Sequence, residues 1–170
     1  REFIQAAKRY PVSICVVTNP VGATAAATSD MLEILSELAE VSLVSANISE
    51  KSEIREDFET IEVSKSGTGG NITVAATRFL INQLRMCCVL QDREEDIVWF
   101  FGATAYLLPL LFAKLLRRTV VLQPRGDVPL TLQLHWEQRI PATLAKLLAG
   151  AVGWLEKIGY RLSNEIVTYT

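Results

Sequence analysis

The chain has 170 residues, of which 49% are apolar and 21% are charged, and its formal net charge is −2. This length suits a single domain, and the apolar share excludes a disordered chain. The charge gives no overall basic footprint, so we expect no nucleic-acid partner.

Cysteine and histidine are too few for a zinc site. The cysteines are Cys15, Cys87 and Cys88, and His135 is the only histidine. No spacing among them fits zinc, and no nucleophile elbow accompanies the histidine, so we expect no metal. Two adjacent cysteines and a third in an apolar run do not suggest a disulfide framework, which favours a reducing cytoplasmic compartment. The first ten residues lack the apolar core of a signal peptide.

The N-terminal part of the chain predicts one strand–helix–strand unit. Residues 12–18 are β-branched and apolar on both faces, as in a central parallel strand. Ser29 or Asp30 is expected to cap a helix that runs through Leu38. Residues 41–45 predict the next strand, so the unit is a right-handed βαβ crossover.

The central part is more polar at first and then helical. Residues 47–57 predict a loop or a short exposed helix, and 58–63 predict an edge strand. Residues 64–71 are rich in turn formers and predict a loop. Helical apolar spacing then covers 72–90.

The C-terminal half continues the alternation of strands and helices. The expected elements are a strand at 97–101, a helix at 103–116, a strand at 119–122, a long helix from Pro141 to about Leu162 and a last strand at 165–169. Residues 130–139 are ambiguous. Strands separated by helices at this spacing predict an α/β fold, a doubly wound, mostly parallel Rossmann-like sheet with helices on both faces.

Glycine follows three of the predicted strands, as Gly22, Gly102 and Gly126. In such sheets ligands bind beyond the carboxyl ends of the strands, and glycine there permits close backbone approach. Each glycine alone can simply make a turn, but three at one edge favour a shared cleft. No dinucleotide fingerprint or P-loop occurs, so the segment 19–28 offers only a small-residue loop before a helix N-terminus, where an anion can bind.

The segment Gln123-Pro-Arg-Gly-Asp127 is the most distinctive local feature. Pro124 and Gly126 flank Arg125 at a strand exit, which would fix its fork of donors toward the cleft. That arrangement suits a phosphate or a carboxylate. The alternative is a structural ion pair between Arg125 and Asp127 or another carboxylate.

These residues carry a resemblance to a known family. The order of residues 97–105, an apolar helix, 118–127 and a long helix leading into 163–170 resembles the N-terminal domain of a GT-B glycosyltransferase of the family 4 type. Many members have Pro-Arg-Gly, or an equivalent His-Gly, at the position of Arg125. The resemblance implies that residues 1–170 form one acceptor-binding domain of a nucleotide-sugar-dependent enzyme, inactive alone, with no cofactor of its own. The C-terminal domain that would bind the nucleotide-sugar donor, and would be its partner, is not in this chain.

The resemblance also implies which residues face the cleft. They are Gly22, Ala23, Thr24, Gly102, Thr104, Arg125, Gly126 and Asp127. The family often has two glycines in the first of these loops, where this sequence has one. A guanidinium stays protonated, so Arg125 would stabilise charge rather than act as a base. The sequence shows neither nucleophile nor base and the catalytic residues are unknown; His135 is the one further candidate.

Family 4 enzymes commonly act on lipid-linked acceptors, and the charge pattern allows a membrane contact. Residues 29–63 carry a net charge of −8, whereas 114–170 carry +4. Tryptophans and bases share the segment 134–162, as an interfacial helix requires. The candidate membrane-facing residues are Trp136, Arg139, Lys146, Trp154, Lys157 and Arg161. The alternatives are a solvated basic face and a helix whose leucines merely pack on the sheet.

The leading hypothesis is therefore a hexosyl-transfer glycosyltransferase domain, cytoplasmic and peripheral at the inner face of the cell membrane, that binds a sugar acceptor. The first alternative is a noncatalytic Rossmann-like module that binds a partner protein or a membrane. The second is a small α/β enzyme that holds another phosphorylated ligand in the same cleft.

Overall fold

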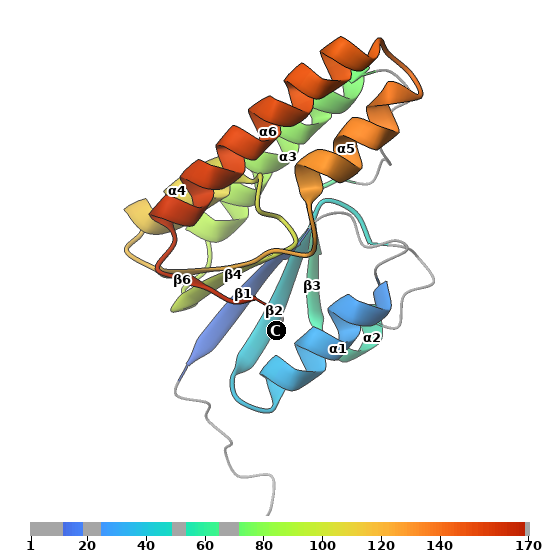
Figure 1. Ribbon diagram of the computed structural model, residues 1–170. Helices are drawn as coiled ribbons and strands as arrows, with labels where there is room; N and C mark the ends of the chain where they lie inside the picture. The colour runs from blue at the N-terminus through green and yellow to red at the C-terminus, as the bar shows by residue number, and fades with distance from the viewer. Residues whose placement is uncertain (1–11, 19–24, 49–53, 65–71, 169–170) are drawn as a thin grey trace, which may run out of the picture.

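A single parallel sheet organises the molecule. The computed structural model describes residues 12–18, 25–48, 54–64 and 72–168 (Figure 1). Within these residues the sheet has six strands, all parallel, in the order β3-β2-β1-β4-β5-β6. The strands are β1 (Ser13–Thr18), β2 (Glu40–Ser45), β3 (Glu59–Glu62), β4 (Ile97–Phe101), β5 (Thr119–Gln123) and β6 (Glu165–Ile166). The helices are α1 (Ala25–Ser36), α2 (Ile54–Asp57), α3 (Ile72–Gln91), α4 (Leu107–Leu115), α5 (Val128–Glu137) and α6 (Ala142–Leu162).

The sheet is covered on both faces, which confirms the predicted fold class. Helix α1 lies on one face, and α3, α4 and α6 lie on the other, with α5 beside α6 (Figure 1). The alternation along β1 explains why that strand is apolar throughout. Ile14 and Val16 pack toward the α1 face, whereas Cys15 and Val17 pack toward the α4 face. Two-sided burial of this kind is typical of a central parallel strand.

Several predicted boundaries need correction. Helix α1 begins at Ala25, so Ser29 and Asp30 lie inside it and cap nothing. Helix α4 begins at Leu107 instead of residue 103, because residues 103–106 form a turn after β4. The residues of that turn are small or apolar, as are those of the helix that follows. The sequence pattern therefore could not show where the turn ends and the helix begins.

The remaining boundaries agree more closely. The ambiguous segment forms α5, the long helix has Pro141 at its N-cap, and the last strand is only two residues long. Strand β3 lies at the edge of the sheet, as expected. The expected loop after residue 64 lies outside the described residues. No helix in the described part of the chain is long and apolar enough to cross a membrane.

The amino ends of the strands carry a cluster of paired charges. Arg93 donates to Glu59 at 2.8 Å and also to Glu95, and Ser42 Oγ donates to Glu95 at 2.9 Å. Cys15 is fully buried beside this cluster, and its own burial raises the pKa of the thiol to about 12, with the Glu95 charge adding to the effect. Arg93, Glu59 and Ser42 are thus paired within the fold, although Glu95 Oε2 has no hydrogen-bond partner among the described residues. Ligands of α/β sheets bind at the opposite edge, at the carboxyl ends of the strands.

Candidate functional site at the carboxyl edge of the sheet

Two glycines set the backbone where β4 and β5 end. Gly102 has φ +64° and Gly126 has φ +90°, a region that favours glycine over residues with a Cβ. The Gly102 amide donates to the Gln123 carbonyl at 2.9 Å, which joins the two strand exits. A Cβ on Gly102 would lie 3.1 Å from Cδ of Arg125. The exits of β4 and β5 therefore lie side by side at Gly102 and Gly126. That the glycine turns line one shared cleft stays a prediction.

Arg125 is held by an aromatic ring instead of by a carboxylate. Its guanidinium carbon lies 4.8 Å from the centroid of Phe101, and within the described residues no ion pair joins it to Asp127. A cation–π contact of this kind holds the guanidinium over the ring and leaves its N–H donors available. The expected alternative, a structural pair with Asp127, is not what the structure contains.

The guanidinium borders a hollow of about 630 Å³ between α1 and the end of β5, which we call the Arg125 hollow. Its floor includes Trp99, whose indole N–H donates to Gln123 Oε1 at 2.9 Å. Helix α1 contributes Asp30 and apolar side chains such as Met31. Arg125 and Asp30 give this lining one charge of each sign. The N–H donors of Arg125 suit an anionic group, and the aromatic and apolar residues beside them suit an attached carbon skeleton.

Asp127 serves the next helix. Its Oδ1 accepts a hydrogen bond of 2.8 Å from the Leu130 amide, so Asp127 is the N-cap of α5, and Pro129 follows in the first turn. This geometry is favourable because a capping carboxylate satisfies a free amide and faces the positive end of the helix. An aspartate two residues before a proline is a helix-start signal in the sequence, although the secondary structure of residues 130–139 could not be decided from it.

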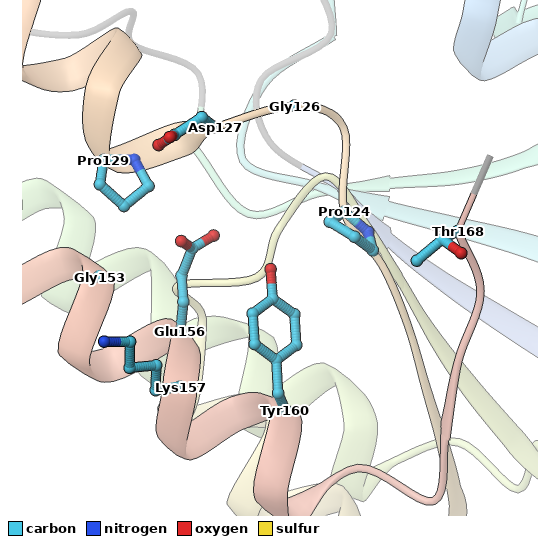
Figure 2. A pocket seen from close by; sticks show the side chains of 9 residues that line it. All are labelled: Pro124, Gly126, Asp127, Pro129, Gly153, Glu156, Lys157, Tyr160 and Thr168. Carbon is cyan, nitrogen blue, oxygen red and sulfur yellow. The ribbon is translucent and has the colours of Figure 1, made fainter. Parts of the chain in front are cut away.

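A second hollow, of about 650 Å³, opens on the other side of the β5–α5 turn, and we call it the α6 cleft (Figure 2). Its lining comes from the β5–α5 turn, helix α6 and the end of the described chain. The lining residues are Pro124, Gly126, Asp127, Pro129, Gly153, Glu156, Lys157, Tyr160 and Thr168. Gly126 borders both hollows, whereas Arg125 and Asp127 line different ones.

Glu156 is the buried polar group of the α6 cleft. The residue is only 6% exposed, and its Oε1 accepts a hydrogen bond from the Thr104 hydroxyl. Burial raises the pKa of the carboxyl above its usual value, and the nearby Asp127 charge raises it further. Burial also raises the pKa of Tyr160, with the Glu156 and Asp127 charges contributing. The Glu156 carboxyl and the Tyr160 hydroxyl therefore both lose their protons at a higher pH than they would in water.

The predicted cleft residues are divided by the fold. Arg125 lines the Arg125 hollow and Asp127 lines the α6 cleft. Gly102 lines neither hollow but lies against the Arg125 side chain. Thr104 is 1% exposed and supports Glu156 from behind instead of facing a ligand. Gly22, Ala23 and Thr24 lie outside the described residues.

His135 is exposed in the last turn of α5 and lines neither hollow. Glu156 and Tyr160 were not predicted as site residues from the sequence. They stand on a helix that the sequence indicated only as packing or interfacial, and the partner of Glu156, Thr104, is 52 residues away in the chain. The one local hint was an isolated acid in an otherwise apolar and basic helix.

Helix α6 also carries an exposed apolar stripe. Leu144, Leu147 and Trp154 are 46%, 69% and 64% exposed, and their spacing places them on one face. Lys146, Lys157 and Arg161 are exposed on the same helix, and its only acid is the buried Glu156. Nearby, Arg139 is exposed and Trp136 is half-buried.

No family model matches the sequence, and no curated protein matches it. The fold is similar to that of MurG from Acinetobacter baumannii, at 12% identity and a TM-score of 0.55, over 93% of this chain and 41% of that one. It is also similar to the C-terminal domain of PF1911 hydrogenase from Pyrococcus furiosus, at 11% identity and a TM-score of 0.50, over 65% of this chain and 90% of that one. The chain thus spans about two-fifths of the length of MurG. At these identities the similarity shows the fold alone.

Proposed function

We propose that this chain is the acceptor-binding domain of a GT-B-type glycosyltransferase of the family 4 kind, completed by a second domain that binds the nucleotide sugar. The observation that carries the proposal is the carboxyl edge of the sheet, where Arg125 is stacked on Phe101 beside an open hollow. The similarity to MurG over 93% of the chain supports it at the level of the fold. This edge is where α/β sheets bind ligands, and it would face the second domain.

In this proposal Arg125 stabilises negative charge on a phosphate or on the acceptor as the sugar is transferred. It does so as a fixed cation, because its stacking on Phe101 removes the need to reorganise during the reaction. The chain itself supplies no base at this position, since a guanidinium remains protonated.

The test is sugar transfer by the complete enzyme, with radiolabelled nucleotide sugars and lipid-linked and soluble acceptors. Arg125→Ala is expected to lower kcat/KM by roughly 10² to 10³-fold, the usual cost of removing a charge-stabilising donor. Arg117→Gly is the matched control, because it removes an arginine of φ +61° next to the opposite edge of the sheet and leaves the backbone unstrained. Unchanged transfer by Arg125→Ala would show that the residue is misassigned.

We further propose that the acceptor is lipid-linked and that α6 rests on an anionic membrane surface, on the cytoplasmic side. The exposed stripe of Leu144, Leu147 and Trp154 supplies apolar contact, and the bases beside it supply attraction to acidic headgroups. The bases and tryptophans expected to face the membrane are Trp136, Arg139, Lys146, Trp154, Lys157 and Arg161.

Sedimentation with vesicles of phosphatidylcholine and phosphatidylserine tests this contact. The wild-type chain is expected to cosediment at low salt and to be released by added salt, because the headgroup attraction is screened. Replacing Leu147 and Trp154 with serine should abolish binding. Leu115→Ser is the control, since Leu115 is 78% exposed but lies on α4, away from the stripe. Equal binding of both variants would exclude the α6 surface.

A noncatalytic module that binds a partner protein is the second candidate. The same exposed stripe favours it, as does the occurrence of a similar fold as a domain of a hydrogenase. Loss of sedimentation with vesicles, together with no transfer activity in the complete protein, would favour this function.

A further inference from the structure

We propose that the α6 cleft is a binding site for a neutral polyhydroxylated ligand, a saccharide ring, separate from the Arg125 hollow. The site deepens the proposed function, on which its interpretation as an acceptor pocket rests. The two hollows share the Gly126 turn, but they present different chemistry to a ligand.

The hydrogen-bonding groups of the cleft converge from two elements. Glu156 projects from α6 toward the β5–α5 turn, and the Asp127 carboxyl stands across from it, with Tyr160 one turn further along α6 (Figure 2). Glu156 uses Oε1 for Thr104, and Asp127 uses Oδ1 for the Leu130 amide. The second oxygen of each carboxyl therefore remains for a ligand. The Glu156 residue is only 6% exposed, so its second oxygen lies in a largely buried position.

The charges of the lining disfavour an anion. Asp127 and Glu156 both face the cleft, and the single base, Lys157, is exposed at its edge. A phosphate or carboxylate would approach two acids before it met a cation, at a cost that grows with burial. Hydroxyl groups, in contrast, both donate to carboxylates and accept from protonated groups.

The apolar part of the lining favours a ring over a linear polar ligand. Pro124 and Pro129 lie on the side of the turn, and Tyr160 contributes an aromatic ring from α6. A saccharide has C–H faces that pack on such surfaces and an equatorial rim of hydroxyls that reaches the acids. A mainly apolar wall with a few converging polar groups is the usual composition of a small-molecule site.

The experiment is a titration of the ¹⁵N-labelled 170-residue chain with the methyl glycosides of glucose, galactose, mannose and N-acetylglucosamine, followed by amide shifts. Inorganic phosphate and ethylammonium are titrated separately as anionic and cationic probes. At least one glycoside is expected to bind with millimolar affinity and to shift the amides of Gly126, Gly153 and Lys157.

Two glycine variants form a matched pair for this titration. Gly153 and Pro129 both line the cleft, and a Cβ at Gly153 would lie 3.3 Å from Pro129 Cγ, so Gly153→Leu would crowd the cleft wall, whereas a Cβ at Gly150 meets nothing within 4 Å. Gly153→Leu is expected to weaken glycoside binding at least tenfold, and Gly150→Leu to leave it unchanged. Tyr160→Phe, which keeps the ring and removes the hydroxyl, is expected to weaken it severalfold. Circular dichroism confirms that each variant is folded.

Three results would overturn the proposal. They are no glycoside binding at tens of millimolar, tighter binding of phosphate or ethylammonium at these amides, and equal binding by the two leucine variants. None of these results changes the outcome of the sugar-transfer assay with Arg125→Ala. The titration therefore tests the saccharide site, and the transfer assay separately tests the glycosyltransferase assignment.

Discussion

The buried carboxyl of Glu156 sets the proton-binding properties of the α6 cleft. The carboxyl is buried, accepts from Thr104 and lies within the field of Asp127. Burial and the Asp127 charge both disfavour its ionised form, so the folded protein holds this proton more tightly than the unfolded chain does. The consequence is a dependence of stability on pH that runs opposite to that of an ordinary paired carboxylate.

Glu156→Gln should reveal this dependence. In wild type, both states are protonated well below the ordinary carboxyl pKa of 4.5. As the pH rises past it, the unfolded chain ionises first and the free energy of unfolding falls until the folded-state pKa is passed. The glutamine variant lacks this loss, so its stability relative to wild type should increase with pH across that window.

Urea unfolding at a series of pH values measures the difference. Glu37→Gln, an exposed carboxyl on the far side of the sheet just after α1, is the control and should follow the wild-type profile. Parallel profiles for wild type and Glu156→Gln would mean that Glu156 ionises as freely in the fold as in the unfolded chain.

At the scale of the element, Gly159 is the residue through which α6 packs closely against the turn after β4. A Cβ on Gly159 would lie 3.2 Å from the Thr104 carbonyl oxygen and 3.6 Å from Leu110 and Leu122. Glycine inside a helix costs stability, so its presence here reflects close packing against the turn after β4. The same contact brings Thr104 within reach of Glu156.

Two alanine variants separate helix propensity from this close approach. Gly150→Ala faces open space and should stabilise the protein by roughly 0.5–1 kcal/mol. Gly159→Ala gains the same propensity but forces the backbone of α6 from Thr104, so it should destabilise by about 1 kcal/mol or more. Thermal and urea unfolding measure both. If both variants were stabilised equally, the contact between α6 and the turn would be loose.

The elements also show how far the sequence could be interpreted. Strand 97–101 was predicted to the residue because five bulky apolar residues end at a glycine. The start of α4 was wrong because the residues after Gly102 are held in a turn by contacts with a distant helix, and no local pattern records such contacts. Helix α5 was predictable in principle from its Asp127 cap and Pro129.

At the scale of the whole molecule, the sheet separates two kinds of polar chemistry. Paired charges around Arg93 occupy the amino edge, where they serve the fold, and the glycine turns occupy the carboxyl edge beside both hollows. The parallel sheet with helices on both faces, and the position of Gly102 and Gly126 at one edge of it, followed from the sequence because parallel strands align their ends. The strand order was not predicted. The division into two hollows also did not follow from the sequence, because it depends on where α6 lies in space.

The turn at Gly126 has a consequence for occupancy. The Gly126 turn borders both hollows, one lined by Arg125 stacked on Phe101 and the other by the buried Glu156 and the exposed Asp127. A displacement of that backbone that enlarges one hollow narrows the other. A ligand in either hollow would contact the Gly126 turn, so any ligand that displaces this backbone in one hollow would change the affinity of the other.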